Sequence, residues 1–259
     1  MKSTEINEHQ IVNHLKIHKS IGIAEAIRIT DSSESTVRRI FRRLEETGNY
    51  LRYYGGIRLT SEDSTDNDYY YEHTENRHLN AKLRIATLAL SLVQDGDEIY
   101  LDSGTTLARF AARLADALEK KELREVHIFT NSLVNLNLLK RHDVTLIGGK
   151  FRELRKDFHG YTAEETIKSL HFKKCFLGTD AYSVQNGFTT TDFSTARLNE
   201  LVLECSDEKY VLMDSSKFFL SSVVSYSRRM MPDKIITEAY PDRSYPETAH
   251  LQVEILADE

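Results

Sequence analysis

A turn with the composition of an anion-binding site directly follows the apolar residues 99–101. The turn consists of Asp102, Ser103, Gly104, Thr105 and Thr106, and a helical pattern of apolar residues begins at Leu107. The start of a helix offers unpaired backbone N–H groups and a positive dipole end. Glycine lets the backbone approach an anion closely, and hydroxyl groups donate to phosphate oxygens without adding charge. The same residues also serve as ordinary helix caps, so this turn alone leaves both interpretations open.

Four further clusters of small, hydroxyl-bearing and charged residues each follow a predicted strand. They are Asn131 with Ser132, Gly148 and Gly149 with Lys150, Thr179 with Asp180, and Asp214 with Lys217. Each cluster alone is explained by turn chemistry. In an open parallel sheet, however, all of them lie at the carboxyl edge, where such folds bind ligands. Hydroxyls, N–H groups and a lysine suit a phosphate, whereas carboxylates and the Asn131 amide suit sugar hydroxyls.

An alternating pattern of strands and helices would position these clusters. It begins with a helix over residues 77–93. The predicted strands are 98–101, 126–129, 144–147, 175–177, 210–213 and 234–237, with a further edge at 251–255, and the helices between them include 133–139, 163–170 and 195–204. Alternation of this kind predicts an α/β fold with an open, mostly parallel sheet.

A second group of residues with recognisable chemistry lies near the N-terminus, on a helix predicted to begin at about residue 33. Val37, Ile40, Phe41 and Leu44 form a buried stripe along it. The opposite face carries Ser35, Thr36, Arg38, Arg39, Arg42 and Arg43. Arginines on one helix face suit DNA phosphates and base edges, although a solvated arginine face on a small bundle is the plain alternative.

The surrounding elements favour the DNA-binding interpretation. Helices are predicted over 6–17 and 23–29, and two short strands over 50–53 and 57–59 add Arg52 and Arg58. Three helices followed by a hairpin predict a winged helix-turn-helix, in which the third helix enters the major groove. We therefore predict that both arginine groups contact DNA.

Composition and charge limit the classes of protein to which the chain can belong. The chain has 259 residues and a net charge of -6, yet residues 1–59 carry ten Lys and Arg against seven Asp and Glu. This asymmetry fits a basic module joined to an acidic one. No apolar run approaches membrane-spanning length, so we expect a cytoplasmic protein without a membrane partner. The two distant cysteines predict neither a disulfide nor a zinc site, and we expect no metal, cofactor or catalytic residue.

The predicted domains are a DNA-binding domain at 1–59, a linker at 60–74 and an effector-binding domain at 75–259. Residues 60–68 are polar and acidic, with no apolar periodicity. The aromatic run Tyr69, Tyr70 and Tyr71 is expected to dock on the second domain or on a partner subunit.

The ordered motifs resemble those of the DeoR family of bacterial transcriptional regulators. The N-terminal part of the resemblance consists of Ser35-Thr36-Val37-Arg38-Arg39, Leu44-Glu45 with Gly48, and Leu51 with Arg52 and Gly55-Gly56. The C-terminal part consists of residues 101–106, 130–132, 147–149, 176–178, 187–189 and 214–217. The resemblance covers nearly the whole chain.

This resemblance implies a C-terminal domain similar to sugar-phosphate isomerases that binds a phosphorylated sugar. Carried over by position, the phosphate would lie on Ser103, Gly104, Thr105 and Thr106. The remaining lining would consist of Asp102, Asn131, Ser132, Gly149, Lys150 and Lys217. Family members act as homo-oligomers, so a dimer or tetramer on paired half-sites is expected.

The sequence is compatible with three functions. The leading one is a repressor that binds double-stranded operator DNA under the control of a sugar phosphate. The second is a sugar-phosphate isomerase that carries an accessory basic domain, with Asp102, Asp180, Asp214 and Lys217 as acid–base groups. The third is an RNA-binding protein, although the predicted module lacks an aromatic sheet for base stacking.

Overall fold

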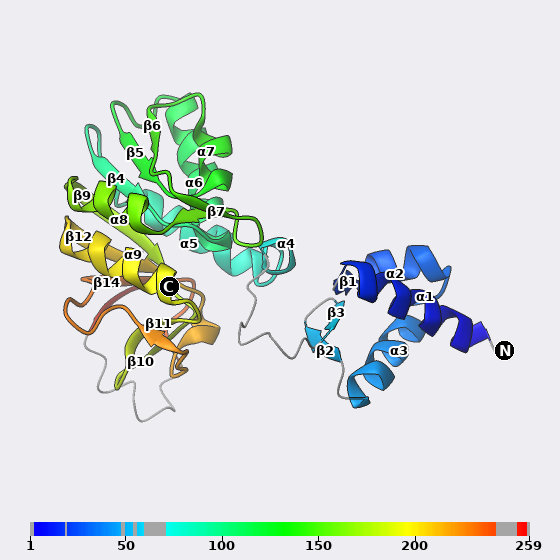
Figure 1. Cartoon of the computed structure of the whole chain (residues 1–259). Coiled ribbons are helices and arrows are strands. Elements are labelled where there is room, and N and C mark those ends of the chain that lie inside the picture. Colours follow the sequence, from blue (N-terminus) through cyan, green and yellow to red (C-terminus); the bar gives the residue numbers. More distant parts are fainter. Residues whose placement is uncertain are drawn as a thin grey trace. The chain divides into compact units, whose positions relative to one another are not determined.

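The computed structural model describes residues 3–18, 20–47, 50–53, 56–59, 71–241 and 253–257. The chain divides into two units, Met1–Asn67 and Asp68–Glu259 (Figure 1). The predicted α/β class, with an N-terminal helix-turn-helix and a C-terminal parallel sheet, is confirmed.

The helices of the first unit are α1 (Ser3–His18), α2 (Ile23–Thr30) and α3 (Glu34–Glu46). Helix α3 begins where predicted because Ser33 caps it: the Ser33 Oγ accepts a hydrogen bond from the Thr36 N–H at 3.3 Å. Its apolar stripe is buried, as the periodicity predicted. This burial leaves the arginine face outside the core.

The described part of the first unit also contains a small antiparallel sheet. Its strands are β1 (Ser20–Gly22), β2 (Tyr50–Tyr53) and β3 (Gly56–Leu59), in the order β1-β3-β2. The hairpin of β2 and β3 was predicted, whereas β1 was not, because three residues between two helices are too few to show a periodicity. The sheet completes a winged helix-turn-helix.

The start of the second unit is a short helix, α4 (Tyr71–Thr74), within the predicted linker. The rest of that linker, residues 60–70, lies outside the described residues, and so do Tyr69 and Tyr70. Tyr71 is buried, and its backbone N–H donates to the carbonyl of Leu154 at 2.9 Å. Tyr71 therefore docks on the second unit, which is one of the two places expected for the aromatic run.

A parallel sheet organises the second unit, and its order over the described residues is β15-β14-β12-β9-β4-β5-β6. All six strand pairings are parallel. The strands are β4 (Glu98–Leu101), β5 (His127–Thr130), β6 (Val144–Leu146), β9 (Phe172–Gly178), β12 (Ser206–Leu212), β14 (Lys234–Thr237) and β15 (Glu254–Ala257).

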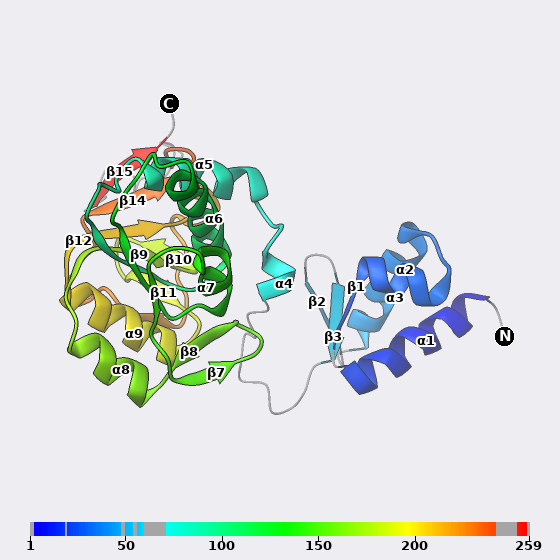
Figure 2. The same ribbon diagram turned by 90° about the horizontal axis from the view of Figure 1, so that it is seen from above.

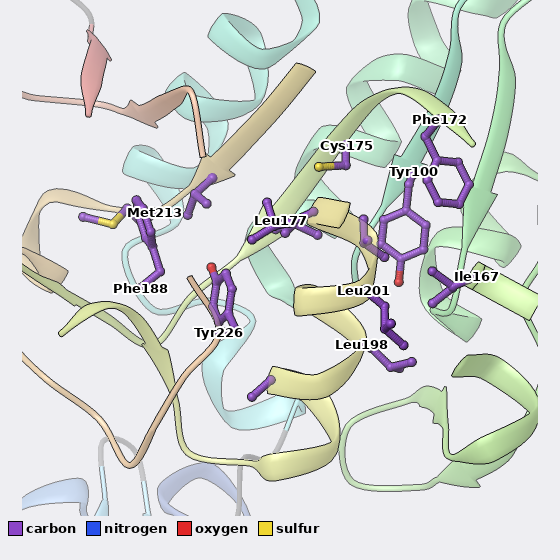
Figure 3. Close-up of a cluster of buried hydrophobic side chains, with 14 of the residues drawn as sticks. Tyr100, Ile167, Phe172, Cys175, Leu177, Phe188, Leu198, Leu201, Met213 and Tyr226 are labelled. Carbon is purple, nitrogen blue, oxygen red and sulfur yellow. The ribbon is translucent and has the colours of Figure 1, made fainter. Parts of the chain in front are cut away.

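Helices cover both faces of this sheet (Figure 2). They are α5 (Leu79–Leu90), α6 (Thr105–Glu119), α7 (Leu133–Leu139), α8 (Tyr161–Lys168) and α9 (Phe193–Glu204). Successive strand residues point to opposite faces, so Tyr100 packs in a core with α8 and α9, while Ile99 and Leu101 pack against α5, α6 and α7. Figure 3 shows the first of these cores, in which Tyr100 lies near Phe172.

The strand order reverses at one place, between β4 and β9. From β4 the chain continues outward to β5 and β6, and then returns to β9 on the other side of β4. The connections that follow the neighbouring strands β4 and β9 therefore run in opposite directions. Such a switch point leaves a crevice beyond the carboxyl ends of the strands, and ligands of open α/β sheets bind there.

Two small additions to the sheet were not predicted. One is the hairpin of β7 (Lys150–Arg152) and β8 (Asp157–His159). The other is a sheet of β10 (Ala181–Ser183), β11 (Gly187–Thr190) and β13 (Val224–Ser225). These strands have two to four residues each, too short for an alternating pattern to stand out.

Candidate functional site

The outer face of α3 presents the arginines singled out in the sequence. Ser35, Arg38, Arg39, Arg42 and Arg43 are exposed, and Thr36 is half-buried. The hydroxyls of Ser35 and Thr36 lie 2.9 Å and 3.0 Å from the Ser33 Oγ, so both belong to the capped start of the helix. Positive charge and helix N-terminal N–H groups are thereby gathered on one surface.

Two of the arginines have carboxylate partners. The Arg38 Nη2 lies 2.6 Å from the Glu34 Oε1, and the Arg43 Nη2 lies 2.7 Å from the Glu8 Oε2. Exposed pairs of this kind contribute only about 0.2–1 kcal/mol, so a DNA phosphate can replace the carboxylate. Within the described part of the chain, no ion pair involves Arg39 or Arg42. Strands β2 and β3 carry the remaining two predicted residues, Arg52 and Arg58.

A cavity of about 290 Å³ lies in the second unit at the switch point of the sheet. Six of the ten predicted effector residues line it: Asp102, Ser103, Gly104, Thr105, Thr106 and Lys217. Thr179, Asp180 and Asp214, which the sequence also placed at the carboxyl edge, line it as well. The topology thus brings the loops after β4, β9 and β12 to one cavity.

Helix α6 begins at this cavity with an open N-terminus. Its cap is Gly104, with a φ of 116° and a ψ of 164°, a conformation that favours glycine. Gly104 has no side chain that could cap the first turn of α6, and a helix N-terminus of this kind favours an anion. The side chains of Thr105 and Thr106 are buried beside them.

Asp102 is buried, with 3% of its surface exposed, and it joins the two strands of the switch point. Its Oδ2 accepts from the Gly178 N–H at 3.0 Å, and its Oδ1 accepts from the Ser103 N–H at 2.7 Å. Burial raises the pKa of this carboxyl to about 6, although these two hydrogen bonds act in the opposite direction. Because its oxygens accept from these backbone N–H groups, Asp102 holds residues 102–106, the predicted anion loop, in place.

Basic residues form another wall of the cavity: Arg77, His78, Lys82, Arg155 and Lys217. Lys82 is only 4% exposed, and its Nζ donates to the Thr74 carbonyl at 2.6 Å. Burial, followed by the nearby charge of Lys217, lowers the pKa of Lys82 to about 8. The Lys217 Nζ in turn donates to the Thr179 carbonyl at 2.6 Å.

Sequence reasoning missed four residues of that wall, although one of them left a signal. Lys82 shares the buried face of α5 with Ile85, Ala86 and Ala89, at the spacing i, i+3, i+4, i+7. A lysine on the apolar stripe of a helix is uncommon, because burial of an ammonium is costly without a partner. Arg77, His78 and Arg155 lie in turns and left no such pattern.

Four predicted effector residues do not line the cavity. The side chains of Asn131 and Ser132 are buried: the Asn131 Nδ2 donates to the Phe158 carbonyl at 3.2 Å, and the Ser132 Oγ caps α7 through the Asn135 N–H. Lys150 is exposed on β7. Gly149 packs so closely that a Cβ added to it would lie 2.5 Å from the His159 carbonyl oxygen.

This contact gives Gly149 a testable packing role. Replacement by alanine is expected to lower the free energy of unfolding by about 2 kcal/mol, because the β8 backbone would have to shift. Gly148→Ala is the matched control, since a Cβ there meets nothing within 4 Å. Urea unfolding of the two variants measures the difference. Equal stabilities would show that the β8 backbone yields without cost.

The β7–β8 hairpin is fixed against the anion loop by a buried network. The Arg152 guanidinium donates to the Asp157 carboxylate at 2.7 Å and also pairs with Asp192 at the start of α9. The Ser103 Oγ donates to the Asp157 Oδ2 at 3.0 Å. The turn of this hairpin carries Arg155 to the cavity.

The charges of the lining suit one anionic group. Asp180 is held in place by its neighbours, because its Oδ2 accepts from the Thr190 and Thr191 hydroxyls and from the Thr191 N–H. Asp214 lies beside Lys217, which lowers the pKa of Asp214, while burial acts in the opposite direction. The cavity lining has four Lys and Arg side chains, Arg77, Lys82, Arg155 and Lys217, against the three carboxyl groups of Asp102, Asp180 and Asp214, so cations are in excess by one.

The described residues contain no group of three or more His, Cys, Asp or Glu side chains placed to hold a metal ion. No helix among them has both the length and the apolar character needed to cross a membrane.

Comparison with protein families gives two matches along the chain. Residues 8–63 match the model described as the DeoR-like helix-turn-helix domain, and residues 77–239 match that of the DeoR C terminal sensor domain. These two ranges correspond to the winged helix-turn-helix and to the unit that holds the cavity.

Individual relatives match across most of the chain. The chain is 33% identical over 213 residues to the HTH-type transcriptional regulator FruR of Bacillus subtilis (strain 168). The matched region covers 81% of this chain and 82% of that protein. It is 32% identical to the lactose phosphotransferase system repressor of Lactococcus lactis subsp. lactis, over 88% of this chain and 89% of the relative. Among solved structures, ribose 5-phosphate isomerase A from Methanocaldococcus jannaschii matches with a TM-score of 0.42 and 21% identity, covering 54% and 55% of the two chains.

Proposed function

The chain belongs to the DeoR family of bacterial transcriptional regulators, and on this premise we propose that it represses a carbohydrate operon under the control of a phosphorylated sugar. The winged helix-turn-helix binds the operator through α3, and the cavity of the second unit binds the effector. The protein acts in the cytoplasm as a homo-oligomer, so that paired α3 helices meet paired half-sites.

The observation that carries the effector proposal is the combination found at the switch point. An uncapped helix N-terminus with Gly104 faces the same cavity as the ammonium groups of Lys82 and Lys217. Backbone N–H groups and cations together are the usual partners of a phosphate. The hydroxyls of Thr179 and Thr190 and the carboxylate of Asp180 offer partners for the sugar hydroxyls.

The relatives support a sugar as the metabolite. Among them is a repressor named for the lactose phosphotransferase system, and another is named as a putative repressor of the aga operon in Escherichia coli O157:H7. The surplus of positive charge in the cavity supports a single phosphate on that sugar. The ligand must favour an arrangement of the protein that binds DNA poorly, because equal affinity for both arrangements would shift nothing.

A gel-shift titration tests this function. The purified protein is mixed with duplex DNA from upstream of its own gene and its neighbours, with and without pentose and hexose phosphates. We expect a specific shift that one phosphorylated sugar reverses, while the same sugar without phosphate has no effect. A gel shift that none of the compounds reverses would rule out the proposed effector site. The proposal that the protein binds operator DNA would remain.

A turnover assay on the same compounds separates the regulator from the isomerase-like alternative. Our proposal expects the bound sugar phosphate to be recovered unchanged. Conversion to an isomer, together with the absence of any specific shift on duplex DNA, would favour an enzyme. Tighter binding to single-stranded RNA than to duplex DNA would favour the third alternative.

A further inference from the structure

The segment of residues 71–78 opens the second unit and is held to it at several points. The Tyr71 N–H donates to the Leu154 carbonyl at 2.9 Å, and the Lys82 Nζ donates to the Thr74 carbonyl at 2.6 Å. The Arg109 Nη2 lies 3.1 Å from the Glu75 Oε1. A one-turn helix such as α4 has little stability of its own, so its order depends on these anchors.

The anchors come from the same elements that form the cavity. Lys82 itself lines the cavity, Leu154 adjoins the lining residue Arg155, and Arg109 belongs to the helix that begins at the anion loop. The segment also contributes Thr74, Arg77 and His78 to the lining. A ligand in the cavity therefore meets this segment directly.

We propose that Lys82 bridges a bound anion to the Thr74 carbonyl, so that occupancy of the cavity fastens residues 71–78 and transmits the effector signal toward the DNA-binding unit. The proposal rests on the proposed function and names the part of the chain that carries the regulation. Lys82 acts as a positioning residue for α4 as well as a ligand contact.

The chemistry of the ammonium group supports a bridge. An ammonium has three N–H donors, and the Thr74 carbonyl accepts one of them. A phosphate oxygen in the cavity can take another while the first bond remains. The anion also favours the charged form of Lys82, which strengthens the bond to the carbonyl. The same carbonyl accepts from the Arg77 N–H at 3.1 Å, so the bridge stabilises the turn after α4.

The position of the segment in the chain gives the bridge its regulatory consequence. The first unit ends at Asn67, only a few residues before Tyr71. Ordering residues 71–78 therefore fixes the part of the second unit that follows residue 70 in the chain. Binding that orders a segment couples to any second event that needs that segment free, so the proposal requires that operator binding by the homo-oligomer needs residues 71–78 free.

Amide hydrogen exchange of the full-length protein, with inorganic phosphate as the probe, tests this proposal. The N–H groups of Glu75 and Arg77 report on the segment, since they donate to the carbonyls of Tyr71 and Thr74. The N–H groups of Thr105 and Thr106 report on phosphate binding. With phosphate we expect slower exchange at both places, by about tenfold at Glu75 and Arg77, as for one charged hydrogen bond.

Two variants separate the bridge from simple anchoring. In Lys82→Met, phosphate is raised until Thr105 and Thr106 are protected, and Glu75 and Arg77 are then expected to show no slowing. Glu75→Gln weakens the ion pair with Arg109 outside the cavity, so it is expected to speed exchange without phosphate and to keep the phosphate response.

The outcomes distinguish this proposal from the proposed function. Protection of Thr105 and Thr106 without slowing at Glu75 and Arg77 would overturn the bridge and leave the effector site intact. Slowing that persists in Lys82→Met would also overturn it. Failure of phosphate to protect Thr105 and Thr106 would overturn the effector site, and the bridge with it.

Discussion

Replacing Arg38 and Arg39 together by alanine is expected to lower operator affinity by about 100-fold or more, because a good arginine contact to a base edge contributes about 1–3 kcal/mol. Both side chains are exposed near the start of α3, and the capped N-terminus of the helix lies beside them. If both contact phosphates, the slope of log affinity against log salt falls by about 1.8. Titrations of operator DNA at several salt concentrations measure both quantities.

Arg141→Ala is the control for this variant. It removes the same type of charge from an exposed residue of the second unit. We expect it to leave operator affinity within about twofold, since Arg141 lies outside the winged helix-turn-helix and acts on DNA only through a screened field. Thermal unfolding and affinity for the sugar phosphate should be unchanged in the double variant. Normal operator affinity in a folded Arg38→Ala, Arg39→Ala protein would show that α3 is not the recognition helix.

Lys82→Met is expected to weaken sugar-phosphate binding at pH 7 by about 10-fold to 100-fold, the size of a lost hydrogen bond to a charged group. Methionine is one heavy atom shorter than lysine and unbranched, so it fills nearly the same buried place on α5. The loss therefore reports the charge and its hydrogen bonds, with little change in packing. Isothermal titration calorimetry of the variant against the native protein measures it.

The pH dependence of sugar-phosphate binding is a stricter test of the contact between Lys82 and the anion. Without ligand, Lys82 loses its proton around a pKa of about 8, through burial first and then through the charge of Lys217. A bound phosphate raises that pKa, so binding takes up a proton above pH 8 and affinity falls there by up to about tenfold per pH unit. Between pH 7 and 8 the lysine is charged and the ligand is mostly a dianion, so affinity is highest.

Lys82→Met should lack this decline above pH 8, whereas Lys140→Met, at an exposed position, should keep it. Calorimetry in two buffers of different ionisation enthalpy gives the number of protons taken up. Constant affinity of the native protein from pH 8 to 10, together with equally tight binding by Lys82→Met, would show that Lys82 does not contact the anion.

Several elements of the fold and the site could be predicted because their patterns are local. The stripe of Val37, Ile40, Phe41 and Leu44 places the arginines on the outer face of α3, whatever else the chain does. The residues from Asp102 to Thr106 indicate a turn between a strand and a helix for the same reason, and their role in anion binding stays a prediction. Alternating strands and helices predict the carboxyl edge at which that loop lies.

Which loops at that edge open into the cavity could not be predicted. Asn131 and Ser132 follow β5 as Asp102 follows β4, yet the β7–β8 hairpin covers them, and the Phe158 N–H donates to the Asn131 carbonyl at 2.8 Å. The hairpin is held there by Arg152, Asp157 and Asp192, which are up to 40 residues apart in sequence. A pairing over such a distance leaves no periodic signal.

The sequence by itself thus determined the helix-turn-helix and α/β fold classes, the arginine face of α3 and the turn between β4 and α6, because helical and strand periodicity, capping and turn chemistry act over a few residues. Only the tertiary structure decided that Lys82, Arg77 and Arg155 complete the cavity and that Gly149 and Lys150 do not line it. The physical reason is that the cavity forms where segments 77–82, 102–107, 155, 178–180 and 214–217 converge. Their convergence depends on the strand order β9-β4 and on the packing of α5, neither of which has a local signature.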